Sequence, residues 1–172
     1  ECSGVLHHMN DPTKGLTNLF EVLEPKGFLK LGLYSKYARK EILKARKLIK
    51  GKDIKPNIDG IRSFRNDVLN GEIKQLNEIT NWSDFYSTSM CRDLCFHSHE
   101  NCYSLIEIKN MLNLSNLEFL GFTLPKDIRD KYLVDNKDKD SLKNLELWDK
   151  FEKSNPYSFR EMYQFWARKS IK

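Results

Sequence analysis

The chain has 172 residues, of which 40% are hydrophobic, and it carries a formal net charge of +5 at pH 7. This composition argues against a disordered chain and suits one domain of ordinary size. No apolar run approaches the roughly 20 residues that cross a bilayer, and the N-terminus lacks a signal-peptide pattern, so we expect a cytoplasmic protein that is not in a membrane.

The cysteines are too few and too unevenly spaced for a disulfide framework in a chain of this length. We therefore predict free thiols in a reducing compartment. Their spacing also matches neither a zinc site nor an iron–sulfur motif, so we expect no metal. The four cysteines are Cys2, Cys91, Cys95 and Cys102.

The first residues, Glu1–Leu6, predict the end of a buried strand that runs into a polar loop at His7 and His8. In open α/β sheets this edge is where ligands bind. Because the chain opens on glutamate and enters a strand at once, we expect a fragment whose preceding half is missing.

A helix is predicted next, capped by Asp11 or Thr13 with Pro12 in its first turn. Its apolar residues recur at i, i+3, i+4 and i+7, and it ends at Glu24–Gly27, where glycine tolerates a positive φ. The following segment, 28–34, is apolar nearly throughout and predicts a buried strand, so that strand, helix, strand and helix form a parallel βαβα unit.

The second of these helices, within residues 36–52, is rich in lysine and arginine. Ala38, Ile42, Ala45 and Ile49 recur at helical spacing between the basic residues, so the charges form the solvated face of an amphipathic helix. Binding of a polyanion such as RNA stays open as a third hypothesis, although the stretch lacks interleaved aromatic residues.

Residues 51–101 predict two helices and loops without a strand, and such an insertion after a central strand is suited to act as a lid over the active site. The rest of the chain, 102–172, returns to α/β character, with helices at 104–114 and 141–152, a charged loop at 135–140 and strands at 117–122 and 162–168. Aromatic residues near the C-terminus are expected in the core. These are Trp148, Phe151, Tyr157, Phe159, Phe165 and Trp166.

Two stretches carry a family resemblance. Residues 2–12, with the motif G-V-L-H-H followed by Asp11-Pro12, and residues 23–35, with the turn Pro25-Lys26-Gly27, resemble the fourth and fifth strands of class I S-adenosylmethionine-dependent methyltransferases. Lys26 stands where the family has the first glycine of a Pro-Gly-Gly turn. Later segments are similar to a bacterial branch of that superfamily: 84–87, 92–94, 96–97, 120–122 and 162–166.

The resemblance implies an α/β fold: a Rossmann-like methyltransferase sheet in three layers, truncated at the N-terminus, with a helical insertion and an antiparallel last strand paired with residues 117–122. It implies an enzyme that transfers a methyl group from the cofactor S-adenosylmethionine. Ser3, Gly4, Val5 and His8 are the expected cofactor-binding residues. The glycine-rich loop that holds the cofactor in the family is absent from the sequence, so the chain alone is expected to bind it weakly or not at all and to be inactive.

The acceptor stays open among a small molecule, a protein side chain and RNA. Expected substrate contacts are Tyr34 and Ser35 after the second strand, with Ser35 alternatively capping the basic helix, and Arg92, His97 and Glu100 in the insertion. An ion pair of Arg92 with Asp93 or Glu100 is the alternative.

No catalytic residue is assigned, because positioning does most of the work in transfer from a sulfonium. His7 and His8 are candidate bases, with packing or loop anchoring as the alternative. The predicted layout is core at 1–50, insertion at 51–101 and the end of the core at 102–172, with no predicted oligomeric state. The alternative function is a non-catalytic interaction or regulatory module that completes its sheet with another polypeptide.

Overall fold

The computed structural model describes residues 1–170, which form two compact units. The sheet unit comprises Glu1–Ala38 together with the chain from His99 onward, and the helical unit comprises Arg39–Ser98. The second boundary lies close to the predicted one. The first boundary falls before the basic helix, which the sequence had placed with the core.

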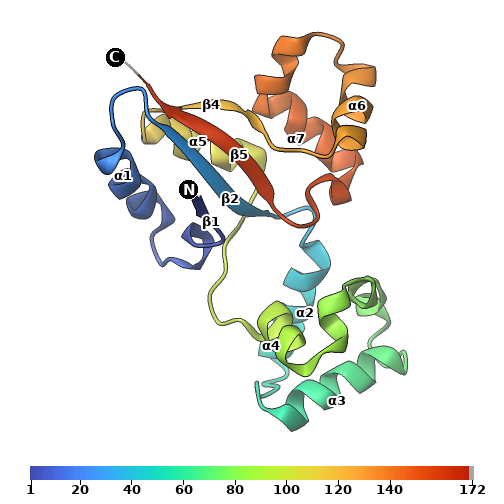
Figure 1. Cartoon of the computed structure of the whole chain (residues 1–172). Coiled ribbons are helices and arrows are strands. Elements are labelled where there is room, and N and C mark those ends of the chain that lie inside the picture. Colours follow the sequence, from blue (N-terminus) through green and yellow to red (C-terminus); the bar gives the residue numbers. More distant parts are fainter. Residues whose placement is uncertain (171–172) are drawn as a thin grey trace. The chain divides into compact units, whose positions relative to one another are not determined.

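The sheet unit contains an open, mixed five-stranded sheet in the order β1-β2-β5-β4, with β3 paired to β2. β1 runs parallel to β2, whereas β5 is antiparallel both to β2 and to β4. The parallel strands β1, β2 and β4 therefore end at one edge, which we call the carboxyl edge (Figure 1). The strands are β1 (Cys2–Ser3), β2 (Phe28–Ser35), β3 (Cys102–Tyr103), β4 (Leu117–Phe122) and β5 (Tyr163–Lys169).

All helices of the sheet unit cover the same face of the sheet. The inward side chains of β2 and β5 form a single apolar cluster with those of the helices. Both crossovers, from β1 to β2 and from β2 towards β4, advance in the same direction, so the right-handed rule places their helices on one side. The helices are α1 (Pro12–Val22), α5 (Leu105–Leu114), α6 (Lys126–Asp135) and α7 (Leu145–Ser154), with 3-10 turns η1 (Leu6–His8), η4 (Lys139–Lys143) and η5 (Pro156–Phe159).

The opposite face of the sheet carries no second buried cluster within residues 1–170. Phe28 is 61% exposed and Trp166 is 43% exposed on this face, and Figure 1 shows the strands in front of α5 with no helix of this unit before them. The three-layer arrangement predicted from the sequence is therefore wrong for these residues, which form two layers. Tyr157, at 51% exposure, and Trp166 were also wrongly expected in the core.

In the turn between α1 and β2, the residue with a positive φ is not the glycine that the sequence predicted. Lys26, not Gly27, adopts the positive φ of 65°. A Cβ on Gly27 would lie 2.8 Å from the Glu24 carbonyl oxygen, so Gly27 is needed for close approach of the backbone. The lysine thus occupies the position at which a left-handed backbone favours glycine.

The helical unit has its own core, built from the apolar faces of its helices. The basic helix belongs here, because Ile42, Ala45 and Ile49 pack in this core. Asn57 caps α3 by accepting a hydrogen bond from the Gly60 amide, as expected for an N-cap asparagine. The elements are α2 (Lys40–Gly51), α3 (Ile58–Leu69), η2 (Lys74–Asn81), η3 (Ser83–Tyr86) and α4 (Thr88–Phe96).

No helix within residues 1–170 has the length and apolar character of a membrane span. The sequence predicted the main strands closely but missed β3, α4 and α6. Four cysteines are free thiols, as predicted.

Candidate functional site

The loop after β1 turns sharply at the carboxyl edge. Gly4 has a φ of 75°, and its amide donates a hydrogen bond to the Gly32 carbonyl oxygen at 3.3 Å. A Cβ on Gly4 would meet no atom within 4 Å, so open space lies beside this glycine. Ser3 ends β1, and Val5 is 53% exposed next to the turn. The four residues predicted to bind a cofactor, including His8, thus lie on one short turn at this edge.

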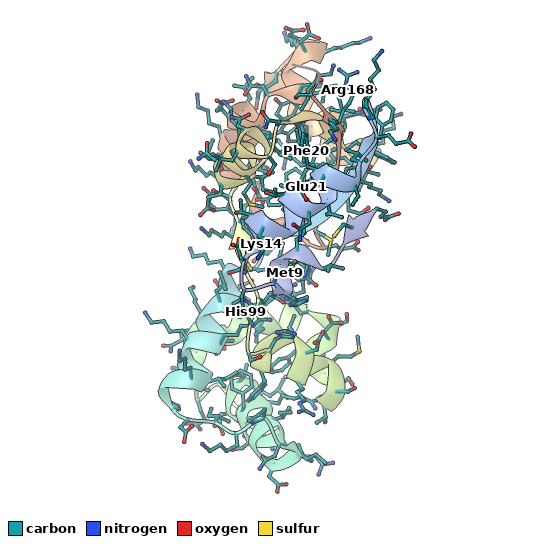
Figure 2. The ribbon with its side chains drawn as sticks, turned by 90° about the vertical axis from the view of Figure 1, so that its left-hand side faces the viewer. Met9, Lys14, Phe20, Glu21, His99 and Arg168 are labelled. Carbon is teal, nitrogen blue, oxygen red and sulfur yellow. The ribbon has the colours of Figure 1, made fainter. Side chains whose placement is uncertain are left out.

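The chain returning from the helical unit fixes this loop in place. The His99 Nε2 donates to the Met9 carbonyl oxygen at 2.9 Å, and Figure 2 shows these two residues side by side. The Asn101 amide donates to the His7 carbonyl oxygen at 2.7 Å, and the His8 Nδ1 donates to the His99 carbonyl oxygen at 3.1 Å. His8 therefore anchors the loop through its ring, which is the alternative that the sequence left open.

His7 is fully buried, and its ring centroid lies 4.1 Å from that of Tyr34. Tyr34 is half-buried near the carboxyl end of β2. The ring contact joins the loop after β1 to the end of β2, so the two predicted parts of the site are adjacent. This ring contact corresponds to the packing alternative for His7.

Ser35, the last residue of β2, is buried and fully engaged within the chain. Its hydroxyl donates to the Glu152 Oε1 at 2.5 Å and accepts hydrogen bonds from the amides of Tyr37 and Ala38 at 3.1 Å and 3.0 Å. The serine therefore organises the turn that leaves β2, but it does not cap the basic helix as the predicted alternative had it, because the N-cap of α2 is Arg39.

Glu152 on α7 connects this turn to β5. Its second carboxyl oxygen accepts a hydrogen bond from the Tyr163 hydroxyl at 2.5 Å. Burial raises the pKa of Glu152 to about 7, and the charge of Asp149 adds to this, whereas the hydrogen bonds from Ser35 and Tyr163 oppose it. Burial and the nearby Glu152 charge raise the pKa of the Tyr163 phenol. A carboxyl group that titrates near neutral pH thus lies beside the carboxyl edge.

Sequence reasoning missed Glu152, although a signal was present. On α7, Leu145, Trp148 and Phe151 point into the core, and Glu152 falls on the same stripe at i+7 and i+4 from the first two. A glutamate on the apolar face of a helix is rarely buried without partners. This position predicts a buried carboxyl group that requires hydroxyl or cationic neighbours.

The predicted substrate residues of the insertion divide between the two units. Arg92 is exposed on α4, and His97 caps the C-terminal end of that helix in the helical unit. Glu100 belongs to the sheet unit, where it accepts a weak hydrogen bond from the Cys102 thiol at 3.9 Å. Within residues 1–170, no ion pair joins Arg92 to Asp93 or Glu100, so that alternative is not realised.

The cysteines and histidines of this region do not gather around a common point. Among the described residues, no group of three or more cysteine, histidine or acidic side chains is arranged to hold a metal ion. Cys91 and Cys95 are instead buried one turn apart on α4 and hydrogen-bond to each other, which lowers the pKa of the Cys91 thiol and raises that of Cys95.

The two arginines of the basic stretch have internal roles. Arg46 donates to the Leu94 carbonyl oxygen at 2.6 Å and caps the C-terminal end of α4. Arg39 is buried, with its guanidinium 5.8 Å from the centre of the Trp82 ring. The exposed charge on α2 therefore comes from its lysines, of which Lys44 pairs with Glu41.

Comparison with known proteins finds a similar protein but indicates no function. A scan against protein-family models finds no match. The chain is similar to an uncharacterized protein of Synechococcus, with 27% identity over 164 residues that cover 87% of this chain and 38% of that protein. The chain thus spans well under half the length of this relative.

Proposed function

We propose that the chain is part of a class I S-adenosylmethionine-dependent methyltransferase that methylates an acceptor not yet identified. The observation that carries this proposal is the strand order β1-β2-β5-β4, in which the antiparallel last strand lies between two parallel strands. The family resemblance implied an antiparallel last strand paired with residues 117–122, and β5 pairs with β4 in that way.

The arrangement of the carboxyl edge supports the same function. The G-V-L-H-H turn and Tyr34 come from consecutive parallel strands and meet through the ring contact between His7 and Tyr34. In open α/β sheets, ligands bind outside the carboxyl ends of the strands. A ligand that bridges these two loops would contact the residues that the resemblance assigns to the cofactor, and Tyr34, which is expected to contact the acceptor because it lies at the end of the second strand.

The residues present fit one end of the cofactor. S-adenosylmethionine, when bound, supplies a methyl group on a positively charged sulfur. Gly4 leaves open space for the methionine part of such a ligand, because neither its own side chain nor a neighbour fills it. His8, anchored to the His99 carbonyl oxygen, holds the turn in position, and positioning contributes much of the rate in an in-line displacement.

Isothermal titration calorimetry with S-adenosylhomocysteine tests the proposal. It is run on this chain and on the product of the complete open reading frame that encodes it. Gly4→Ala is compared with Gly71→Ala, a matched control, because both glycines have a φ near 75° with no atom within 4 Å of the added Cβ. The two variants therefore impose similar backbone strain in different units.

We expect the complete product to bind S-adenosylhomocysteine, Gly4→Ala to weaken binding at least about tenfold because it displaces the turn, and Gly71→Ala to leave the affinity unchanged. Failure of the complete product to bind would overturn the cofactor assignment. An equal loss in both variants would show that Gly4 does not act at the cofactor.

A second candidate function is an interaction module that completes its sheet with another polypeptide. The uncovered sheet face with Phe28 and Trp166 favours it, because sheets with parallel strands are normally covered on both faces. Reading the encoding DNA upstream separates the two candidates. A glycine-rich strand-loop-helix in frame supports the enzyme, and a stop codon close by supports the module.

A further inference from the structure

The turn through which the chain leaves the sheet unit is tied to a buried carboxyl group. Residues 35–38 lead from the end of β2 to the boundary of the helical unit. The Ser35 hydroxyl accepts hydrogen bonds from the amides of Tyr37 and Ala38 and donates one to Glu152. Glu152 therefore orients the side chain around which this turn is built.

Glu152 is buried without a cation beside it. Within residues 1–170 it forms no ion pair, and its two carboxyl oxygens accept hydrogen bonds from the hydroxyls of Ser35 and Tyr163, both at 2.5 Å. Two hydroxyl donors replace only part of the hydration that a carboxylate has in water, so burial favours the protonated form. The contacts of Glu152 are thus most stable while it holds a proton.

The charged group that acts on Glu152 from its own helix opposes ionisation. The Asp149 carboxylate is 3% exposed, pairs with Lys153 at 2.8 Å through one oxygen, and leaves the other oxygen buried without a hydrogen-bond partner. Lys153 also hydrogen-bonds to the Tyr37 side chain, so the turn and Asp149 engage this cation. On β5, the Tyr163 phenol keeps its proton because burial and the Glu152 charge raise its pKa.

The other elements that pack against α7 carry charges that are paired among themselves. Lys36 in the turn pairs with Glu107 on α5, and Lys109 on α5 pairs with Glu146 at the start of α7. None of these four side chains contributes to the pKa of Glu152. Its ionisation is therefore governed by burial, by the two hydroxyls and by the neighbouring carboxylate.

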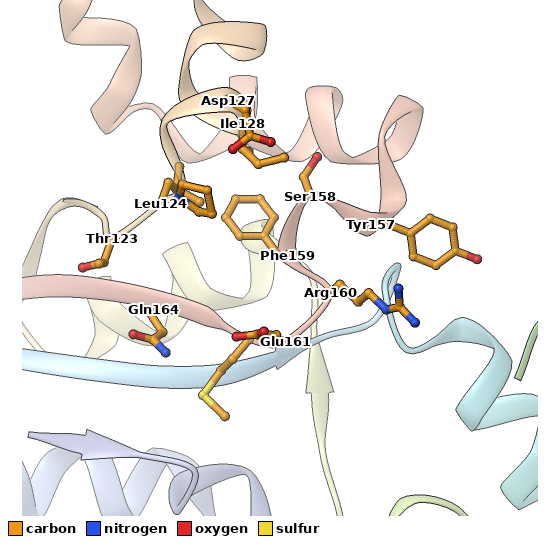
Figure 3. Close-up of a pocket in the computed structure, with 12 residues that line it drawn as sticks. Thr123, Leu124, Asp127, Ile128, Tyr157, Ser158, Phe159, Arg160, Glu161 and Gln164 are labelled. Carbon is orange, nitrogen blue, oxygen red and sulfur yellow. The ribbon is translucent and has the colours of Figure 1, made fainter. Parts of the chain in front are cut away.

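A pocket of about 570 Å³ opens between α6 and η5, and Tyr163 lies in the chain between two residues that line it, Met162 and Gln164. Solvent therefore reaches the strand on both sides of Tyr163. None of the charged side chains of the pocket contributes to the pKa of Glu152. These side chains, drawn in Figure 3, are Asp127, Arg160 and Glu161.

We propose that Glu152, Ser35 and Tyr163 form a proton-sensitive latch, which holds residues 35–38 in place while Glu152 is protonated and loosens when Glu152 ionises. A loosened turn lets the carboxylate reach water. The latch thereby regulates the order of the segment that joins the sheet unit to the helical unit. An effect on Tyr34, the expected acceptor contact that precedes Ser35, rests on the proposed function, whereas the latch itself does not.

The size of the effect follows from the pKa of Glu152 in the closed and in the open turn. Burial raises this pKa from 4.5 to about 7, and a carboxyl group that reaches water returns to the ordinary value. The folded pKa is the higher one, so the hold on the turn is complete below pH 4.5 and is lost as the pH rises to about 7. Linkage then predicts an open population about 10 to 30 times larger at pH 8 than at pH 5.5.

NMR of the ¹⁵N-labelled chain tests the latch through the amide exchange rates of Tyr37 and Ala38, corrected for the intrinsic dependence of exchange on pH. We expect the corrected rates to rise about 10- to 30-fold from pH 5.5 to pH 8. The Ile61 amide, which donates to the Asn57 carbonyl oxygen in the helical unit, is the internal reference and should not change. ¹³C NMR of the glutamate carboxyl groups gives the titration of Glu152 in the same protein.

Two glutamate variants separate the latch from general effects of pH. Glu152→Gln cannot ionise, so its corrected rates at Tyr37 and Ala38 should not depend on pH. Glu146→Gln is the matched control, because Glu146 is exposed on the same helix and pairs with Lys109, and it should keep the wild-type rise.

Unchanged corrected rates in the wild type, an equal rise in Glu152→Gln, loss of the rise in Glu146→Gln, or titration of Glu152 below about pH 5.5 would overturn the proposal. None of these readouts needs S-adenosylmethionine. Failure of the latch is therefore distinguishable from failure of the methyltransferase proposal, which S-adenosylhomocysteine binding decides.

Discussion

Replacing Glu152 with glutamine changes how the stability of the sheet unit depends on pH. Glu152 is fully buried and accepts hydrogen bonds from the hydroxyls of Ser35 and Tyr163. The other charged group facing it is Asp149, whose carboxylate is paired with Lys153 at 2.8 Å. Glutamine keeps the size of the side chain and an acceptor oxygen but cannot ionise.

The direction of the effect follows from the raised pKa. Burial raises the pKa of Glu152 from 4.5 to about 7 in the folded chain, so the folded state holds this proton more tightly than the unfolded state. The resulting stability is fully present below pH 4.5 and is lost as the pH rises to about 7. At 1.36 kcal/mol per pKa unit, the loss is about 2 to 3 kcal/mol between pH 5 and pH 8.

Urea denaturation at pH 5, 6, 7 and 8 measures this loss as a difference between the wild type and Glu152→Gln. Both proteins carry Trp82→Phe, which removes the one tryptophan of the helical unit and leaves Trp148 and Trp166 to report on the sheet unit by fluorescence. We expect Glu152→Gln to gain about 2 to 3 kcal/mol relative to the wild type across this range. Parallel curves, with a constant difference from pH 5 to pH 8, would refute the reasoning.

Three further substitutions test single contacts by the same denaturation assay. Lys26→Gly is expected to stabilise the chain by about 1 kcal/mol, because it relieves the left-handed backbone at a φ of 65°, and no change would contradict this. Gly32→Ala is expected to lower the free energy of unfolding by about 1 to 3 kcal/mol, because the new Cβ meets the Met162 sulfur. The double variant with Met162→Ala should lose less stability than the sum of the losses in the two single variants. Arg46→Met is expected to destabilise the helical unit by about 1 to 2 kcal/mol, measured from the part of the tryptophan fluorescence change that Trp82→Phe abolishes. The exposed control Lys47→Met should change the stability of this unit by less than about 0.5 kcal/mol.

The main elements of the sheet unit were predictable because each is specified by local pattern. The apolar run at 28–34 has the composition of a buried strand, and the 3.6-residue spacing in residues 16–23 specifies the helix before it. Asp11 caps that helix by accepting a hydrogen bond from the Lys14 amide, as one of the two predicted caps. These features depend on residues within a few positions of one another.

Elements that depend on distant partners were missed. β3 is only two residues long and exists because it pairs with the end of β2. α6 has weak amphipathic character, and Tyr132, stacked on Trp148 at 3.6 Å, is its one buried residue, so its sequence gave no periodic signal. Long-range contacts, not local preference, stabilise both elements.

In the candidate site, too, the features set by local sequence were predicted and those set by distant contacts were not. The G-V-L-H-H and Tyr-Ser segments identified the carboxyl edge, since they follow directly from consecutive strands. The sequence did not show that His7 packs against Tyr34. It also did not show that the Ser35 hydroxyl donates a hydrogen bond to Glu152, which lies 117 positions away. It also gave no indication of the pocket between α6 and η5, whose walls come from two segments about thirty positions apart.

The sequence by itself determined the main strands of the sheet, the helix between the first two of them and the separate apolar patterns of the sheet and of the insertion, because hydrophobic periodicity and backbone preferences act over a few residues. Only the tertiary structure decided that all helices of the sheet unit cover one face, that α2 packs with the insertion and that Glu152 is buried near neutral pKa. Those outcomes depend on which surfaces meet across the fold, and the pKa of Glu152 is raised mainly because this packing removes its carboxyl group from water.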